Sequence, residues 1–152
     1  MKTKTLWVEN SKTLQDHSRI GQKISQTLGD RAILLLQGDL GAGKTELVKS
    51  IVQSQSGGQA TSPTFALHHQ YQGQRCLIDH YDLYRLENED DLETTGFWDV
   101  FSQNKGLILI EWPERINESH LPLNWPIYLV KLTLQNVGQS TEYRKVEFSV
   151  RD

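Results

Sequence analysis

The chain of 152 residues has little cysteine, little proline and no long hydrophobic run. Its single cysteine, Cys76, excludes an intramolecular disulfide framework, and its apolar neighbours favour a buried structural thiol over a reactive one. No apolar run approaches the roughly 20 residues that a membrane-spanning helix needs. Residues 1–7 are basic but lack the apolar core of a signal peptide. We therefore expect a cytoplasmic protein with no membrane contact.

The chain also lacks an excess of positive charge. Its net charge of −3 argues against a dedicated nucleic-acid binder, although a local basic patch is compatible with it. Mean hydropathy is −0.53 and hydrophobic residues make up 37%, as is typical of globular chains. Because no repeat, low-complexity tract or linker interrupts the sequence, residues 1–152 are predicted to form one domain, which would bury about 68–70% of its extended-chain surface.

One complete motif stands out. Residues 38–45 read Gly-Asp-Leu-Gly-Ala-Gly-Lys-Thr and match the phosphate-binding pattern G-x-x-x-x-G-K-[ST] at every defined position. An apolar run of strand length, 32–36, precedes the motif, and apolar residues with helical spacing follow at 47–52. A glycine-rich turn without a ligand is the alternative. The strand–loop–helix order instead predicts a P-loop nucleotide-binding site.

Each residue type in this loop has a chemical reason. The glycines let the backbone bring its N–H groups against phosphate oxygens, and the following helix directs its positive dipole end at the same anion. Lys44 would neutralise the β- and γ-phosphates, and the Thr45 hydroxyl would ligate Mg²⁺. The nucleotide-binding residues expected here are Asp39, Leu40, Gly41, Ala42, Gly43, Lys44, Thr45 and Glu46.

Hydrophobic periodicity predicts an α/β fold, a P-loop NTPase domain with a mixed sheet flanked by helices and an antiparallel hairpin at the C-terminus. Asn10 or Ser11 is expected to cap the first helix, and a polar connection at 55–59 to end the second. The acidic run 86–95 is interpreted as a solvated helix face or loop. Strands are expected at 3–8, 31–37, 65–71, 75–81, 107–110, 125–134 and 142–150, and further helices at 44–54 and 97–103.

Two apolar patterns give more detailed expectations. The first helix should place Leu14, His17, Gly21, Ile24 and Leu28 along one side. In the C-terminal hairpin, alternation divides the apolar residues into two sets that we expect on different faces. The first set is Tyr128, Val130, Leu132 and Leu134, and the second is Val146, Phe148 and Val150.

A P-loop nucleotidase also needs an acid at a strand end to organise Mg²⁺, and the sequence offers Asp82 and Glu111. Glu111 directly follows a continuous apolar run, at the kind of strand end where ligands of open α/β sheets collect. Asp79 should point away from Asp82, because side chains alternate along a strand. Spacing alone does not decide which of the two acids organises Mg²⁺. A simple ion pair is the alternative for each acid, Glu111 with Arg115 and Asp82 with Arg85.

Four motifs that follow one another along the chain resemble those of a known protein family. They are Gly-Asp-Leu-Gly-Ala-Gly-Lys-Thr at 38–45, Ser-Pro-Thr-Phe at 62–65, His-Tyr-Asp-Leu-Tyr-Arg-Leu at 80–86 and Glu-Trp-Pro-Glu-Arg at 111–115. Together they make the chain resemble the TsaE (YjeE) family of bacterial P-loop ATPases over nearly its whole length. The resemblance also includes the N-terminal helix and Arg-Lys-Val-Glu at 144–147.

The resemblance implies an ATPase that takes part in biosynthesis of N6-threonylcarbamoyladenosine (t6A) at position 37 of tRNAs that read codons beginning with A. In that family TsaC makes the threonylcarbamoyl-adenylate, and ATP hydrolysis resets the TsaB–TsaD complex between rounds. The implied cofactors are ATP or ADP and Mg²⁺. The implied partner is the TsaB–TsaD complex, with tRNA contacted only through it, and a monomer is favoured.

Family roles transfer to individual residues of this chain. The resemblance assigns catalytic roles to Lys44, Asp82 and Glu111, and makes Thr45 and Glu111 the Mg²⁺ ligands. Trp112 matches an aromatic near the nucleotide, with core packing as the alternative, and Arg144 matches a nearby basic position, with an exposed strand arginine as the alternative. The other matches are Ser62 and Thr64 in a loop that would sense the γ-phosphate, and His80 as a hydrogen-bonded structural residue.

The chain departs from the family pattern at two positions. Glu46 stands where the family has Thr or Ser, so a hydroxyl contact with the α-phosphate is lost. A carboxylate in the first turn of a helix gains about 0.3–1 kcal/mol from the dipole, but it would repel phosphates if it turned inward. Tyr81 replaces a common Phe, which is conservative.

Three other functions fit a P-loop. A small-molecule kinase should carry an arginine-bearing lid, which the acidic segment 87–93 does not clearly supply. A GTPase should carry N-K-x-D, whereas 104–107 reads Asn-Lys-Gly-Leu. A non-catalytic adaptor would use ATP to order the loop at 61–65 and recruit a partner without turnover.

Overall fold

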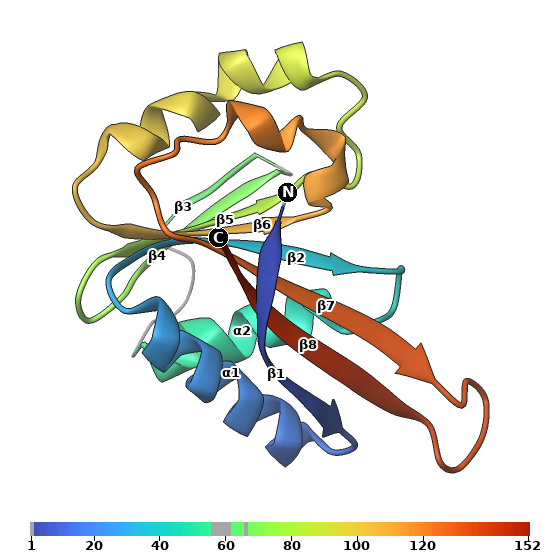
Figure 1. Cartoon of the computed structure of the whole chain (residues 1–152). Coiled ribbons are helices and arrows are strands. Elements are labelled where there is room, and N and C mark those ends of the chain that lie inside the picture. The colour runs from blue at the N-terminus through green and yellow to red at the C-terminus, as the bar shows by residue number, and fades with distance from the viewer. Residues whose placement is uncertain (1, 56–61, 66) are drawn as a thin grey trace.

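The computed structural model describes residues 2–55, 62–65 (backbone only) and 67–152. These residues form one eight-stranded mixed sheet in the order β1-β8-β7-β2-β6-β5-β4-β3. The sheet lies between two α-helices on one face and four short 3₁₀ helices on the other (Figure 1). This is the predicted α/β architecture, a mixed sheet flanked by helices with an antiparallel hairpin at the C-terminus.

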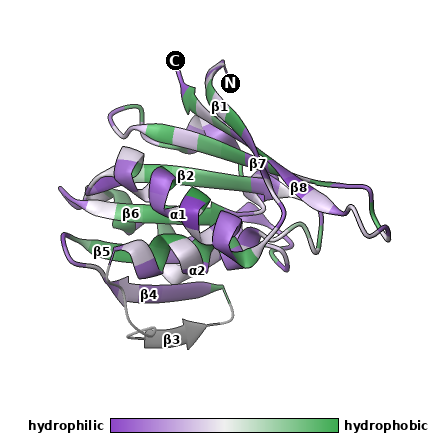
Figure 2. Ribbon diagram, turned by 90° about the horizontal axis from the view of Figure 1, so that it is seen from below, coloured by the Kyte–Doolittle hydropathy of each residue, from purple (hydrophilic) through white to green (hydrophobic). Residues whose placement is uncertain are grey.

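The centre of the sheet is parallel. β2 (Arg31–Gly38) pairs with β6 (Gly106–Glu111) on one side and with β7 (Ile127–Gln135) on the other, and β6 pairs with β5 (Leu77–Asp82). Every residue of β6 is buried, as expected for a strand covered on both faces. Figure 2 shows β2 and β6 as the most apolar strands of the sheet. Their carboxyl ends therefore form a rigid edge on which a site can be built.

The outer strands are antiparallel. β4 (His68–Gln72) and β5 form the predicted hairpin, but Phe65 belongs to the separate edge strand β3 (Ser62–Phe65), so the expected strand at 65–71 begins three residues too early. At the other edge, β8 (Tyr143–Arg151) pairs with β7 and with β1 (Thr3–Ser11). The polar connection predicted at 55–59 lies outside the described residues beyond Gln55.

The C-terminal hairpin corrects one prediction. Val130 lies opposite Phe148 and Leu132 opposite Val146, so the two apolar sets are cross-strand neighbours on the same face. Both sets contribute to the core beneath the α-helices, where Tyr128 stacks on Phe148. Alternation within each strand was read correctly, but the register between the strands cannot be deduced from either strand alone.

Two helices cover this face, α1 (Leu14–Leu28) and α2 (Lys44–Ser54). The predicted cap at Asn10 or Ser11 is wrong, because β1 continues through Ser11 and Thr13 caps α1 in a capping box with Asp16. Four of the five residues expected along the inner side of α1 are buried, whereas Leu14 is 81% exposed. A Cβ on Gly21 would collide with Ser50, so this glycine allows α1 and α2 to pack closely.

The opposite face carries η1 (Glu89–Thr95), η2 (Phe97–Ser102), η3 (Pro113–Arg115) and η4 (Glu118–His120). Most of the acidic run 86–95 is η1, which Asn88 caps; it buries Leu92 and exposes most of its carboxylates, as interpreted from the sequence. The short helix expected at 97–103 is η2. In the part of the chain that the structure describes, no helix is both long and apolar enough to cross a membrane.

Candidate nucleotide site

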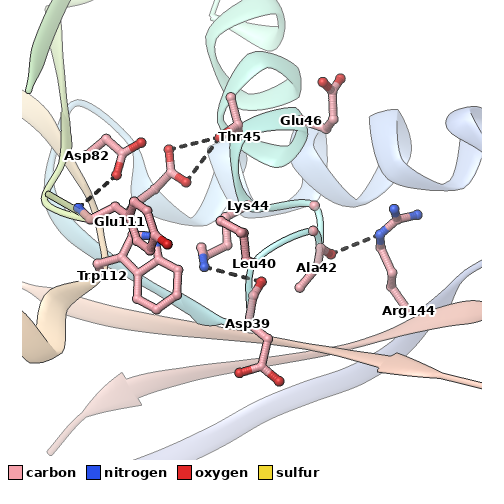
Figure 3. Close-up of a pocket in the computed structure, with 13 residues that line it drawn as sticks. Asp39, Leu40, Ala42, Lys44, Thr45, Glu46, Asp82, Glu111, Trp112 and Arg144 are labelled. Atoms are coloured by element: carbon pink, nitrogen blue, oxygen red, sulfur yellow. Dashed lines mark hydrogen bonds between the residues drawn. The ribbon is translucent and has the colours of Figure 1, made fainter. Parts of the chain in front are cut away.

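A pocket with a volume of about 290 Å³ opens at the carboxyl ends of β2, β5 and β6 (Figure 3). The loop between β2 and α2 forms one wall, as the strand–loop–helix pattern predicts. All predicted site residues with described side chains line this pocket, whereas the side chains of Ser62 and Thr64 lie outside the described residues. The lining consists of Asp39, Leu40, Gly41, Ala42, Gly43, Lys44, Thr45, Glu46, Asp82, Tyr84, Glu111, Trp112 and Arg144.

Glycines give the loop its close fit. Gly43, the N-cap of α2, has φ = 101°, a conformation that side chains strongly disfavour. At Gly38 a Cβ would lie 2.8 Å from the Leu132 carbonyl oxygen, so the loop passes directly against β7. The first residues of α2 line the pocket, and the N–H groups at a helix start, which have no partner within the helix, favour anions.

Thr45 and Glu111 meet across the pocket. The Thr45 hydroxyl lies 3.2 and 3.3 Å from the two Glu111 carboxylate oxygens and donates to them (Figure 3). Glu111 is only 2% exposed and also accepts a 2.5 Å hydrogen bond from His80 Nε2. In the described part of the chain no ion pair joins Glu111 to Arg115, the alternative considered from the sequence. His80 is hydrogen-bonded, as expected, and it fixes the orientation of the carboxylate.

Lys44 is folded back onto its own loop. Its ammonium group donates to the backbone carbonyls of Gly38 and Asp39, the latter at 3.4 Å, and lies 3.6 Å from the ring centroid of Trp112. Burial lowers the pKa of Lys44, and the nearby carboxylates of Glu111, Glu114 and Asp82 oppose that shift. The two carbonyls and the ring thus hold the lysine ammonium in the pocket, and an ammonium is a donor that suits phosphate oxygens.

Trp112 lies at the turn after β6 with φ = 60°, a left-handed conformation that is uncommon for a bulky residue. This turn brings its ring over Lys44 and against Tyr84, at 5.0 Å between ring centroids. The ring therefore lies in the pocket wall and is also partly buried against the core on the side of the 3₁₀ helices, so both readings from the sequence apply. Tyr84 lines the same pocket, although the sequence assigned it no role; its place two residues after Asp82 was the available signal.

Asp82 ends β5 directly beside Glu111 in the parallel register, so both side chains emerge at the same edge. Its Oδ1 accepts from the Tyr84 backbone N–H at 3.1 Å, and within the described ranges no ion pair connects it to Arg85. Asp79 points to the opposite face, where it pairs with His68 at 2.7 Å, as strand alternation predicts. The structure thus brings both candidate acids, Asp82 and Glu111, to one site.

Two further residues lie at the outer end of the pocket. Glu46 is 58% exposed and pairs with Lys49 at 3.4 Å, so its carboxylate turns away from the loop (Figure 3). Arg144 comes from β8, and its Nε donates to the Ala42 carbonyl at 2.9 Å. It is therefore neither a free surface arginine nor aimed solely at a ligand, since it holds the loop backbone.

This arrangement has the chemistry of a site for a phosphate chain with a hard cation. One pocket combines backbone N–H groups at a helix start, a lysine, and a hydroxyl that lies within hydrogen-bond distance of a carboxylate. The oxygen donors of Thr45 and Glu111 suit Mg²⁺, which takes one or two protein ligands and completes its shell with phosphates and water. The donor set therefore fits that ion.

Comparison with known proteins gives a consistent result. The family model described as "Threonylcarbamoyl adenosine biosynthesis protein TsaE" matches residues 11–146. Relatives named "tRNA threonylcarbamoyladenosine biosynthesis protein TsaE" include one from Rickettsia conorii, 37% identical over 110 residues, which cover 71% of this chain and 62% of the relative. One from Treponema pallidum is 37% identical over 117 residues, covering 74% and 82%.

The matched region thus spans less than two thirds of the first Rickettsia relatives, 62% and 63% of their lengths. Among solved structures, the crystal structure of Bacillus subtilis YdiB shares the fold, with a TM-score of 0.68 and 22% identity. That similarity covers 99% of this chain and 88% of YdiB.

Proposed function

This chain belongs to the TsaE family, and from that premise we propose that it binds and hydrolyses ATP with Mg²⁺ during t6A biosynthesis in tRNA. The family description and the names of its relatives refer to that pathway. The site adds the chemical part of the proposal, because its donors suit a triphosphate and a hard cation.

One observation carries the proposal: the Thr45 hydroxyl lies against the Glu111 carboxylate at the start of α2. A hydroxyl directly after the P-loop lysine and an acid at the end of a neighbouring strand are the two protein groups that hold Mg²⁺ in P-loop nucleotidases. Here they come from residues 66 positions apart and meet in one pocket. Bound Mg²⁺ would neutralise charge on the β- and γ-phosphate oxygens.

The other residues have distinct roles in this proposal. The loop amides and Lys44 hold the phosphate chain, and Trp112 covers Lys44 and limits access of water to it. Asp82 accepts a hydrogen bond from the attacking water, whose oxygen bonds to the γ-phosphorus as the bond to the ADP oxygen breaks, and the proton that the water loses ends on the released phosphate. His80 keeps the Glu111 carboxylate in one orientation.

We further propose that hydrolysis is slow until the TsaB–TsaD complex binds, and that tRNA is reached only through that complex. In this proposal the chain is a single-domain cytoplasmic monomer that resets TsaB–TsaD between rounds of modification. Two observations support this part of the proposal. The four ordered motifs resemble those of the family, and the pocket is lined by Leu40 and Tyr84, which are both exposed to solvent.

The test is ATP hydrolysis by the full chain with and without purified TsaB–TsaD, alongside multiple-turnover modification of tRNA. We expect TsaB–TsaD to stimulate hydrolysis and repeated tRNA modification to require this protein. Lys44→Ala should abolish both. Lys105→Ala is the matched control, because this exposed lysine pairs with Asp30 at the opposite end of the parallel strands.

Outcomes that contradict the proposal are specific. Undiminished hydrolysis by Lys44→Ala would remove the site assignment. ADP formation only in the presence of a small acceptor would favour a kinase, and tighter binding of GTP than of ATP would favour a GTPase. ATP-dependent binding to TsaB–TsaD without any hydrolysis would favour the adaptor.

A further inference from the structure

Two consecutive carbonyls of the phosphate-binding loop are held from outside the loop. The Ala42 carbonyl accepts from Arg144 Nε at 2.9 Å, and the Gly43 carbonyl lies 3.2 Å from His17 Nε2. His17 comes from α1 and Arg144 from β8, so two elements distant in sequence converge on one pair of peptide groups. Neither the motif nor the resemblance assigned a role to His17.

Both side chains pack directly against Gly43. A Cβ at this position would lie 2.8 Å from Arg144 Nε and 3.5 Å from His17 Cε1. Because Gly43 has φ = 101° and no side chain, the arginine and the histidine approach the backbone closely. Both contacts therefore depend on the absence of a side chain at Gly43.

The hydrogen-bond partners of His17 define its tautomer. A carbonyl oxygen only accepts, so Nε2 carries the proton that is donated to Gly43. Nδ1 is then the acceptor and lies 3.3 Å from the Ser11 hydroxyl, which donates to it. His17 and Ser11 are 6% and 2% exposed, and burial, the largest cause, lowers the pKa of His17. A neutral imidazole with one defined donor is the result.

Peptide geometry gives these contacts a consequence. A trans peptide is planar, so its carbonyl and its N–H point in opposite directions. The peptide that carries the Ala42 carbonyl also carries the Gly43 N–H, and the Gly43 carbonyl shares its peptide with the Lys44 N–H. The Gly43 carbonyl also accepts the first helical bond, from Leu47 N–H, so the direction of this peptide is fixed twice.

We propose that His17 is a positioning residue of the phosphate-binding loop, acting beside Arg144 to hold two consecutive carbonyls outward so that the Gly43 and Lys44 amides face the phosphates. This inference rests on the proposed function, because it assumes that the pocket binds a nucleotide. His17 touches neither the phosphates nor the metal; it acts through the backbone. The imidazole is neutral in this role, so direct electrostatic attraction to phosphate does not contribute to its effect.

The test compares ADP affinity among variants of the full chain by isothermal titration calorimetry. His17→Leu removes the donor at similar size and should weaken ADP binding about fivefold, the value of one neutral hydrogen bond. His17→Gln keeps an N–H donor and should bind within about twofold of wild type. Ile24→Val, a buried change on the same helix, should lower the melting temperature and leave ADP affinity unchanged.

A spectroscopic reading separates positioning from general stability. In ¹H–¹⁵N spectra, ADP should shift the Gly43 and Lys44 amide signals in the wild type and in His17→Gln, and shift them less in His17→Leu. If His17→Leu does not fold, Ser11→Ala takes its place. It frees Nδ1 and should raise the Nδ1–H tautomer in the ring ¹⁵N spectrum, with about twofold weaker ADP binding.

Wild-type ADP affinity in His17→Leu, or equal loss in His17→Gln and His17→Leu, overturns the inference alone. Unchanged ADP affinity and tautomer in Ser11→Ala does the same. If the folded wild type binds no ADP, the proposed function fails, and the inference fails with it.

Discussion

Two histidine–carboxylate pairs lie on neighbouring strands of the same sheet and differ in their surroundings. His80 donates to Glu111 at 2.5 Å and His68 pairs with Asp79 at 2.7 Å, and both carboxylates are almost fully buried. Glu111 also receives the Thr45 hydroxyl and lines the pocket. Asp79 faces the other side of the sheet and receives Gln70 Nε2 at 3.1 Å.

The difference comes from strand parity. His80 and Asp79 are adjacent on β5, so their side chains point to opposite faces, and only one face meets the P-loop. Every oxygen of Glu111 has a partner, whereas Asp79 Oδ2 is buried with no partner within the described part of the chain. A histidine–carboxylate pair thus borders the proposed nucleotide pocket on one face and belongs to the sheet packing on the other.

The largest expected effect is on the Glu111 pair. Glu111→Ala removes the carboxylate opposite Thr45 and should lower ATP turnover roughly 100-fold or more, since in the proposed site this carboxylate holds the Mg²⁺ that neutralises phosphate charge. Hydrolysis should be measured per mole of folded protein in the presence of TsaB–TsaD. Turnover within a few-fold of wild type would show that the pair beside the P-loop is no more functional than its counterpart.

The reverse pattern is expected for Asp79→Ala. It strips His68 and Gln70 of a buried acceptor and should lower the free energy of unfolding by about 1–3 kcal/mol, measured by urea denaturation. ATP turnover per folded molecule should remain within about twofold. A variant that is stable but inactive would refute the separation of the two faces.

Local features could be predicted from motifs, apolar runs and alternation within one strand, whereas the face shared by the two strands of the C-terminal hairpin could not, because it depends on their pairing. The motif predicted the P-loop, helical spacing predicted α2 at 44–54, and alternation predicted the opposite directions of Asp79 and Asp82. Glu111 and Asp82 could be identified as candidate acids, but their convergence depends on β5 and β6 being parallel neighbours. That adjacency is a property of the topology, which no local pattern encodes.

Other features could not be predicted from the sequence, because they also depend on tertiary contacts. The cap of α1 lies at Thr13 because β1 pairs with β8 through Ser11, and this tertiary pairing overrides the capping preference of Asn10 and Ser11. The contact of His17 with Gly43 joins residues 26 positions apart across a helix packing. Periodicity places His17 on the inner side of α1 but says nothing about what it meets there.

His17 extends the comparison to a buried histidine that bonds a hydroxyl and a carbonyl and no carboxylate. Burial lowers its pKa from the ordinary 6.5, so below that pH the unfolded chain binds a proton that the native chain resists. The free energy of unfolding should therefore fall as pH drops below about 6.5. The total loss is ~1.4 kcal/mol for each pH unit by which the folded pKa lies below the unfolded one.

His17→Gln should lose less stability than wild type between pH 7 and pH 5, measured by urea denaturation at each pH. Equal losses in the two proteins would mean that burial of His17 does not couple protonation to folding.

The smallest effect is expected at Glu46, which directly follows the P-loop motif and departs from the family pattern. Its carboxylate is solvated and paired with Lys49, and exposed pairs of this kind contribute less than about 1 kcal/mol. Glu46→Thr should therefore change ATP affinity by less than about threefold, measured by calorimetry with Lys44→Ala as the non-binding control and with salt varied from low to high. A gain of tenfold or more at low salt that vanishes at high salt would show that the carboxylate repels the nucleotide, and its outward orientation would then not hold in the bound state.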